Sequence, residues 1–231
     1  MGGAHATDTA VLDDPTGAAL AGAHSGFARR HGQAVCYDPA VTLFAALPAG
    51  AGPEAWEDLA ALVRPGGTAV LIGDYPVPAG WRITWQDDVV QLVDATVAVA
   101  DEPSAVPLGA ADVPEMLDLV ERTRPGPFLA RTVEMGSYLG IRQDGKLVAM
   151  AGERMRLPGF TEISAVCTDP AYRGQGLASR LVRAVAAGVR RRGETPYLHA
   201  ASDNTGAIRL YEAMGFAVRR QLTFTVVVAP D

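Results

Sequence analysis

Residues Phe160–Ala178 combine the residue types and spacing that could hold a phosphate group. An apolar, β-branched run over Ile163–Thr168 is followed by the loop Arg173-Gly174-Gln175-Gly176 and then by an amphipathic run. This pattern predicts a strand, a loop and a helix in that order. The N–H groups of such a loop surround the positive end of the helix dipole, and its glycines let a phosphate approach the main chain. We therefore expect a pyrophosphate site.

The spacing Arg-x-x-Gly-x-Ala at Arg173, Gly176 and Ala178 resembles motif A of the GCN5-related N-acetyltransferases (GNAT). The same spacing occurs at residues 29–34 and 64–69, but those matches lead into β-like runs and not into a helix. In the family, the amides of this motif hold the pyrophosphate of acetyl-coenzyme A. The resemblance implies that acetyl-coenzyme A is the cofactor and that it is bound by Arg173, Gly174, Gln175, Gly176, Leu177 and Ala178.

A second stretch, from Asn204 to Phe216, closely resembles the other signature of the family. There the asparagine contacts the cofactor and a tyrosine lies near its sulfur, which implies these roles for Asn204 and Tyr211. A phenol with a pKa of about 10 can hydrogen-bond to a departing thiolate and protonate it. The alternative is that Tyr211, three residues from both Ile208 and Met214, is only a packing residue.

Acetyl transfer to an amine also requires that the tetrahedral oxyanion be stabilised. The family uses a main-chain N–H on the strand before motif A, at the point where that strand separates from its neighbour. By resemblance, the N–H of Val166 is the expected donor, and Cys167 and Thr168 are expected to pair with the pantetheine arm of the cofactor.

Glu162 is the first candidate for the general base, because it lies eleven residues before Arg173. The histone acetyltransferase branch of the family carries its catalytic glutamate at this spacing. Burial beside apolar neighbours is expected to raise the pKa of Glu162 towards neutrality. A solvated charge at a strand end is the competing interpretation, and Glu153, His199 and an ordered water are alternative bases.

Composition indicates a globular chain without an evident nucleic-acid function. Of 231 residues, 48% are hydrophobic and 20% charged, and the net charge is −6. Cys36 and Cys167 are expected to be structural thiols in a reducing compartment. No secretory signal, membrane span or metal-ligand spacing is recognisable, so we expect a cytoplasmic protein without a metal.

The order of the elements predicts an α/β (α+β) fold. Residues 1–13 are expected to be irregular, and a helix is expected from Asp14 to Ala28. Asp101-Glu102-Pro103-Ser104 suggests a boundary between a smaller α/β N-terminal lobe, residues 1–103, and a GNAT domain with a mixed central sheet, residues 104–231. From residue 105 the expected order is α, β, β, β, α, β, α, β. Two-lobed relatives of the glycine N-acyltransferase-like (FR47-like) branch carry an N-terminal lobe that is a degenerate copy of the same fold, and the analogy with them extends that interpretation to the lobe of this chain, whose role is open.

These features together predict an N-acetyltransferase in which a primary amine attacks acetyl-coenzyme A directly. The Asp-Gly step at Gln143-Asp144-Gly145 predicts a tight hairpin. The acceptor, which is a small amine, an amino acid or a protein N-terminus, depends on residues 124–135, this hairpin and the first hundred residues. A homo-oligomer is possible. The alternative functions are an acyl-coenzyme A-binding sensor without turnover and a nucleotide-binding structural domain.

Overall fold

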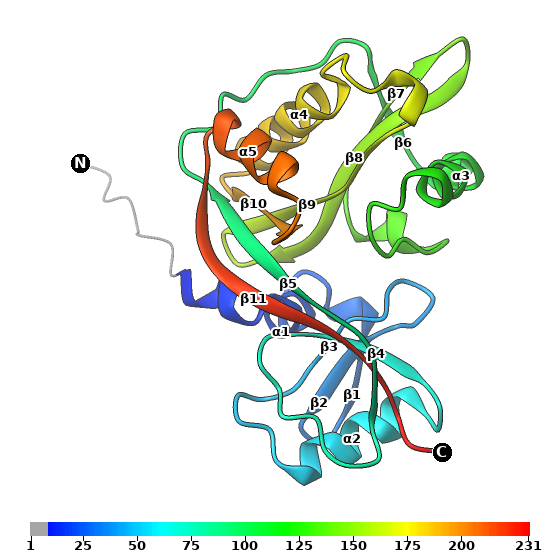
Figure 1. Cartoon of the computed structure of the whole chain (residues 1–231), viewed down its shortest axis with the longest axis vertical. Helices are drawn as coiled ribbons and strands as arrows, with labels where there is room; N and C mark the ends of the chain where they lie inside the picture. The colour runs from blue at the N-terminus through cyan, green and yellow to red at the C-terminus, as the bar shows by residue number, and fades with distance from the viewer. Residues whose placement is uncertain (1–8) are drawn as a thin grey trace.

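The computed structural model describes residues 9–231, which form one eight-stranded and one three-stranded sheet covered by helices (Figure 1). The large sheet is mixed, in the order β4-β11-β5-β10-β9-β8-β7-β6, and the small sheet has the order β1-β2-β3. This confirms the predicted α/β (α+β) class. The strands are β1 (Ala28–His31), β2 (Ala34–Tyr37), β3 (Ala45–Ala46), β4 (Thr68–Ile72), β5 (Arg82–Asp94), β6 (Ala105–Leu108), β7 (Tyr138–Gln143), β8 (Lys146–Leu157), β9 (Phe160–Thr168), β10 (Thr195–Ala201) and β11 (Phe216–Val228).

Five α-helices connect and cover these strands, with short 3₁₀ segments between them. The α-helices are α1 (Pro15–Ala21), α2 (Pro53–Val63), α3 (Val113–Thr123), α4 (Leu177–Arg191) and α5 (Thr205–Met214). The 3₁₀ segments are η1 (Thr9–Asp13), η2 (Ser25–Phe27), η3 (Ala110–Asp112), η4 (Thr132–Met135) and η5 (Pro170–Tyr172).

Two long strands join the upper and lower parts of the molecule in Figure 1. Strand β5 comes from the first hundred residues, yet it lies between β10 and β11 and pairs antiparallel with both. Strand β11, the last of the chain, in turn pairs with β4. The division at residue 103 stays a prediction, and these pairings place strands from both sides of it in one sheet.

Helices cover one face of the large sheet over its β7–β10 half. Helix α4 carries Leu177, Leu181, Val185 and Val189 at intervals of four, and all four are buried against the sheet together with residues of α5. Helix α3 packs on β8 and β9 on the opposite face (Figure 1). The N-terminal segments cover the rest of that face through Leu12, Tyr37, Phe44 and their neighbours. Both faces of β9 are therefore buried.

The structure differs from the predicted elements mainly near the N-terminus. Residues 1–8 lie outside the described part of the chain, but residues 9–13 form η1 and Leu12 is fully buried, so they are not irregular. Helix α1 ends at Ala21 and not at Ala28, because the chain turns at Gly22, whose N–H bonds to the Ala19 carbonyl. The extra strand β6 was missed; it is a four-residue edge strand containing Pro107, which pairs only with β7.

The same succession of elements occurs twice along the chain. A hairpin, a strand, a helix and a further strand follow one another as β1–β2, β3, α2 and β4, and again as β7–β8, β9, α4 and β10. In the second set β9 and β10 are parallel, and in the first set Phe44 and Val70 form a parallel bridge. Corresponding loops therefore lead into α2 and α4.

Candidate active site

The loop before α4 presents a row of backbone donors. Gly174 and Gly176 have φ of +78° and +71°, the left-handed region that glycine adopts without strain. Within residues 9–231 the N–H groups of Gly174–Ser179 have no hydrogen-bond acceptor, and the first helical bond runs from the Arg180 N–H to the Gly176 carbonyl at 3.1 Å. The free N–H groups lie at the positive end of a fifteen-residue helix. This arrangement can hold an anion.

Asp169 fixes the start of this loop, and the sequence analysis did not identify that role. Its side chain is 8% exposed and accepts from the Ala171 N–H at 3.0 Å, from Lys146 Nζ at 3.1 Å and from Arg122. The Ala171 N–H and the Lys146 ammonium lower the pKa of Asp169. An aspartate just before a proline is a common turn residue, so the sequence could indicate the turn but not its two cationic partners.

One arginine near the loop is left without a carboxylate partner. Four of the six arginines between residues 173 and 192 are paired with carboxylates, as Arg180–Glu102, Arg190–Asp94, Arg191–Asp101 and Arg192–Glu153. In the described part of the chain, neither Arg173 nor Arg183 forms an ion pair, and Arg173 is exposed within the loop itself. Arg173 is therefore the positive charge best placed to meet a phosphate there.

Strands β9 and β10 separate in the region that the resemblance predicted. They pair only from Phe160 to Glu162 on the β9 side, so the second half of β9 has no partner on this edge. Ala165 has φ of +53°, and the pairing with β8 jumps from Gly152 opposite Ser164 to Met150 opposite Cys167. This is a β-bulge, which changes the direction of the backbone at Ala165 and Val166.

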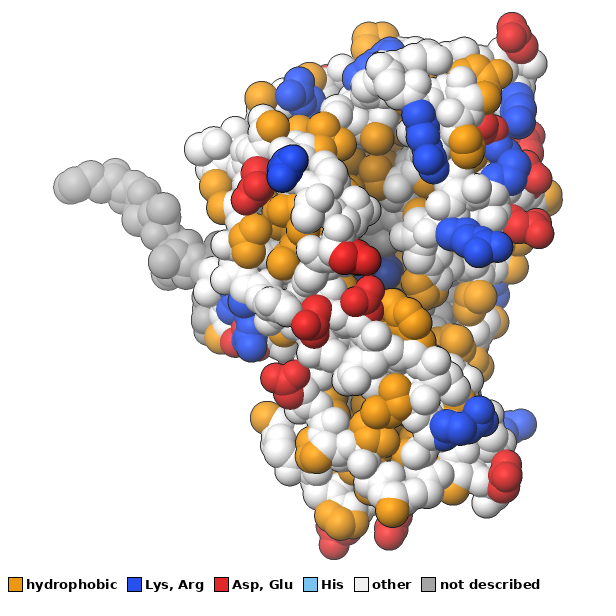
Figure 2. Space-filling view, viewed as in Figure 1, with side chains coloured by type: hydrophobic (Ala, Val, Ile, Leu, Met, Phe, Trp, Pro, Cys, Tyr) orange, Lys and Arg blue, Asp and Glu red, His pale blue; other side chains and the backbone are white. Residues whose placement is uncertain are grey.

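Two buried hydroxyl groups lie at the ends of the separated strands. Thr168 Oγ1, at the end of β9, and Ser202 Oγ, just beyond β10, are buried and have no hydrogen-bond partner among residues 9–231. Figure 2 shows a hollow in the middle of this face of the molecule, with acidic side chains gathered at its lower margin. Unpaired buried hydroxyls beside a gap between strands fit the amide groups of a pantetheine arm.

Cys167 lies beside these groups but is unsuited to act as a nucleophile. It is 6% exposed, and burial raises the pKa of its thiol to about 11. Cys36 is also buried and reduced. Both cysteines are therefore structural thiols, as expected.

Helix α5 positions both Asn204, at its N-cap, and Tyr211, two turns further on. The Asn204 side chain caps this helix by accepting from the Ala207 N–H at 3.1 Å. Tyr211 is 9% exposed and packs edge-on against Phe216, with ring centroids 6.0 Å apart. Burial raises the pKa of its phenol to about 12, and its hydroxyl has no hydrogen-bond partner in the described residues. Tyr211 is therefore a protonated donor at neutral pH.

Glu162 has the opposite electrostatic environment to the one predicted for it. Arg154 donates to both of its carboxylate oxygens, at 2.8 and 2.5 Å, and His199 Nδ1 lies 2.7 Å from Oε1. Burial alone would raise the pKa of Glu162, but the charge and hydrogen bonds of Arg154, with the bond to His199, lower it to about 2. The expected upward shift is wrong, because the apolar neighbours are outweighed by a buried guanidinium.

The N-terminal segment closes over this ion pair. Glu162 is fully buried, and the Arg154 guanidinium lies 4.8 Å from the ring centroid of Phe44. His199 Nε2 lies 3.1 Å from the Gln91 amide, whose oxygen accepts from Arg219 at 3.0 Å. His199 is thus a hydrogen-bonded interior residue, and the Glu162 carboxylate is buried behind Arg154 and His199.

Glu153, the other carboxylate considered as a base, is also engaged. It is 6% exposed, binds Arg192 at 3.0 Å and accepts from the Ser137 N–H at 3.4 Å. No group of three or more His, Cys, Asp or Glu side chains in the described chain could hold a metal ion. No helix there has the length and apolar character required to span a bilayer.

Comparison with known proteins identifies several relatives. Residues 138–225 match the model of the FR47-like protein family. A solved structure of a protein of the GNAT family from Novosphingobium aromaticivorans is 42% identical, with a TM-score of 0.87, and the match covers 95% of this chain and 98% of that one. The N-alpha-acetyltransferase RimI of Mycobacterium tuberculosis is 38% identical over 99 residues, which is 40% of this chain. The mycothiol acetyltransferase of Mycobacteroides abscessus is 35% identical over 94 residues, also 40% of this chain.

The extent of these matches differs between the relatives. The chain spans 61% of the length of RimI and 29% of the length of the mycothiol acetyltransferase. The match to the Novosphingobium protein extends over almost the whole of both chains, including the N-terminal segments that cover Glu162.

Proposed function

The chain belongs to the GNAT superfamily, in its FR47-like branch, and we propose that it transfers an acetyl group from acetyl-coenzyme A to a primary amine. The observation that carries this proposal is the combination of the loop at Gly174–Ser179, with its unpaired N–H groups, and the separated strands β9 and β10. A loop of free donors suits a pyrophosphate, and a gap between strands suits an extended arm.

The cofactor supplies the activated acyl thioester, and residues of this chain would hold it. In the proposal, the N–H groups from Gly174 to Ala178 and the side chain of Arg173 bind the pyrophosphate. The backbone of Val166, Cys167 and Thr168 pairs with the pantetheine arm, and the unpaired Thr168 hydroxyl supports this role. Asn204 has its amide nitrogen available for a contact, because only its oxygen caps α5.

The catalytic groups in this proposal act mainly by donating hydrogen bonds. The bulge at Ala165 supports a role for the Val166 N–H as the oxyanion donor, because a bulge leaves one residue of a strand unpaired. Tyr211 donates to the leaving thiolate. Since Glu162 and Glu153 are both engaged in ion pairs, we infer that the amine loses its proton to an ordered water.

The acceptor is a primary amine of undetermined structure. One relative is named as an N-alpha-acetyltransferase and another as a mycothiol acetyltransferase, so the α-amine of a peptide and a small-molecule amine are both candidates. A cytoplasmic location is part of the proposal and is supported by the two reduced, buried cysteines.

Replacing Gly176 with leucine is expected to weaken the binding of acetyl-coenzyme A, measured by calorimetric titration. A side chain at φ of +71° costs about 1–2 kcal/mol, and it would also occupy the space that a phosphate needs. Gly193→Leu is the matched control, because Gly193 has φ of +76° at the other end of α4 and an added Cβ meets no protein atom within 4 Å there.

We expect at least a tenfold weaker affinity in Gly176→Leu and an unchanged affinity in Gly193→Leu. Failure of the wild-type protein to bind acetyl-coenzyme A would refute the proposed cofactor. Binding by wild type and Gly176→Leu alike would instead show that the cofactor binds away from this loop.

A further inference from the structure

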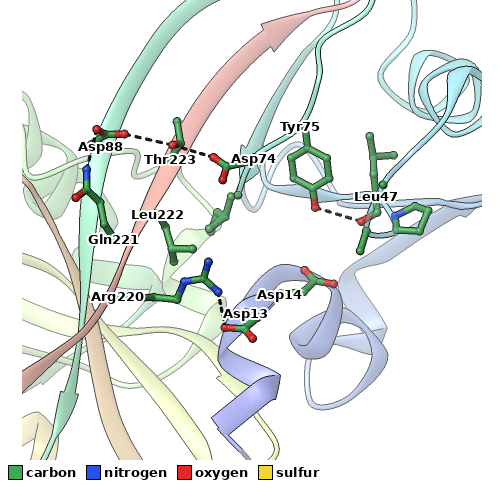
Figure 3. Close-up of a pocket in the computed structure, with 15 residues that line it drawn as sticks. Asp13, Asp14, Leu47, Asp74, Tyr75, Asp88, Arg220, Gln221, Leu222 and Thr223 are labelled. Carbon is green, nitrogen blue, oxygen red and sulfur yellow. Dashed lines mark hydrogen bonds and ion pairs between the residues drawn. The ribbon is translucent and has the colours of Figure 1, made fainter.

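A cavity of about 580 Å³ lies at the edge of the large sheet where β4 ends and β11 continues. Its size falls in the range of pockets that bind small molecules. Five segments of the chain form it: the turn before α1, the loop before α2, the end of β4 with the chain that leaves it, Asp88 of β5, and β11. Figure 3 shows Asp74 and Asp88 on one side of the cavity and Asp13 and Asp14 on the opposite side, with Leu222 and Leu47 flanking the space between them.

The charges around this cavity are not balanced within the protein. Asp13 is paired with Arg219 and Arg220, the latter at 2.8 Å. Asp14, Asp74 and Asp88 form no ion pair with any described residue, and the side-chain donors to Asp74 and Asp88 are neutral. Thr223 donates to both, at 3.3 and 3.2 Å. Three uncompensated carboxylates facing one space favour a positively charged occupant.

Desolvation also acts on the carboxylate of Asp14, which caps the N-terminus of α1. Partial desolvation raises the pKa of Asp14, although the residue is exposed and the Gly17 N–H donates to it at 2.9 Å. The described carboxylates do not form a cluster that could hold a metal ion. Acidic groups on two sides with apolar side chains between them suit an organic cation better, because its carbon chain would contact the leucines.

The position of the cavity follows from the repeated order of elements. The loop at residues 47–52 leads from β3 into α2, as the loop at residues 169–176 leads from β9 into α4. At this point the segment with β3 separates from β4, because Phe44 and Val70 form only a single parallel bridge. In the same way β9 separates from β10 after Glu162. The cavity thus lies, in the first half of the chain, where the proposed cofactor site lies in the second. Its aspartates would repel a pyrophosphate, so the ligand must differ in charge.

We propose that this cavity is a binding site for an aliphatic diamine or polyamine, with one ammonium group near Asp14 and another near Asp74 and Asp88. The site differs from the proposed cofactor site, because no residue of β9, β10 or the Gly174–Ser179 loop lines the cavity.

Calorimetric titration with 1,4-diaminobutane, with spermidine and with 1-aminobutane tests the proposal on the full chain without acetyl-coenzyme A. We expect both polyvalent amines to bind at least tenfold more tightly than the monoamine. Absence of binding by the two polyvalent amines would overturn the proposal, and equal affinity of 1-aminobutane and 1,4-diaminobutane would do so as well. Because acetyl-coenzyme A is titrated separately, neither result alters the proposed acetyltransferase function.

Two variants place the ligand in the cavity. Asp14→Asn keeps a good helix-capping side chain, and Asp74→Asn keeps an oxygen for the Thr223 hydroxyl. Each substitution is expected to weaken the affinity for 1,4-diaminobutane at least tenfold, to a value close to the affinity for 1-aminobutane. Glu57→Gln, which removes an exposed acid from α2 outside the cavity, is the charge-matched control and should bind as wild type does. Wild-type affinity in both aspartate variants would contradict the site.

Discussion

Replacing Tyr211 with phenylalanine is expected to lower kcat about 100-fold while the affinity for acetyl-coenzyme A is retained. The Tyr211 hydroxyl has no partner among the described residues, so the substitution breaks no hydrogen bond within the protein. The ring contact with Phe216 is preserved, because phenylalanine has the same ring. A loss of turnover would therefore report on the hydroxyl alone.

The raised pKa of Tyr211 determines how its hydroxyl can act. With a pKa of about 12, the phenol is protonated throughout the neutral range and is always a donor. A thiol has a pKa of about 8.5, so complete proton transfer from Tyr211 to a thiolate is unfavourable. The hydroxyl should instead stabilise the developing charge by a hydrogen bond, which is worth about 2.7 kcal/mol if kcat falls 100-fold.

Tyr197→Phe is the matched control for this experiment. The Tyr197 hydroxyl is also buried without a partner, but it lies on β10 among the residues that contact the N-terminal segments. Its removal should leave kcat and the cofactor affinity unchanged. Thiol release measured with one acceptor amine, together with calorimetric titration of acetyl-coenzyme A, separates the two effects. Unchanged kcat in Tyr211→Phe would remove Tyr211 from the mechanism and favour the packing interpretation.

The second half of the fold was predictable because its local signals agree with the tertiary structure. In α4, apolar residues at intervals of four, arginines in the last turn and Gly193 all indicate the same helix, which the structure forms from Leu177 to Arg191. The β7–β8 hairpin likewise follows from Asp144-Gly145, where both residues have positive φ. Such features depend on neighbours in sequence, so the sequence alone was sufficient.

The position of β5 was not predictable, because no local signal specifies which strands it joins. Its hydrophobic pattern indicates a strand but is compatible with either half of the chain, and only tertiary packing places it between β10 and β11. The environment of Glu162 was missed for the same reason. Arg154 lies eight residues away on another strand, and Phe44 belongs to a distant segment, so spacing could not reveal the partners that fix its pKa.

Replacing Glu162 with glutamine is expected to lower the free energy of unfolding at pH 7 by about 3–5 kcal/mol. The variant leaves the Arg154 guanidinium, which is 8% exposed, without the carboxylate that balances its charge. A buried cation without a counter-charge is far more costly than a complete pair. Urea unfolding of the wild type and the variant measures this loss.

The pH dependence of that difference has a definite sign. The pKa of Glu162 is lowered in the folded protein from 4.5 to about 2, so folding is favoured by the ionised form. The contribution to stability is complete above about pH 4.5 and is lost progressively as the pH falls towards 2. The free energies of unfolding of the wild type and Glu162→Gln should therefore converge below pH 4.5, and a constant difference across this range would contradict the lowered pKa.

The same variant separates a structural role for Glu162 from a role as the general base. Loss of a general base typically lowers kcat 10²- to 10⁴-fold, whereas loss of a sealed ion pair should alter kcat little at temperatures where the variant is folded. Glu153→Gln is the matched control, because its partner Arg192 is partly exposed and water can replace the lost carboxylate. We expect Glu162→Gln to be the less stable of the two, with kcat per folded molecule within about tenfold of wild type. A loss of kcat beyond 100-fold in folded Glu162→Gln would mean that an amine reaches this carboxylate, and that the N-terminal segments open to admit it.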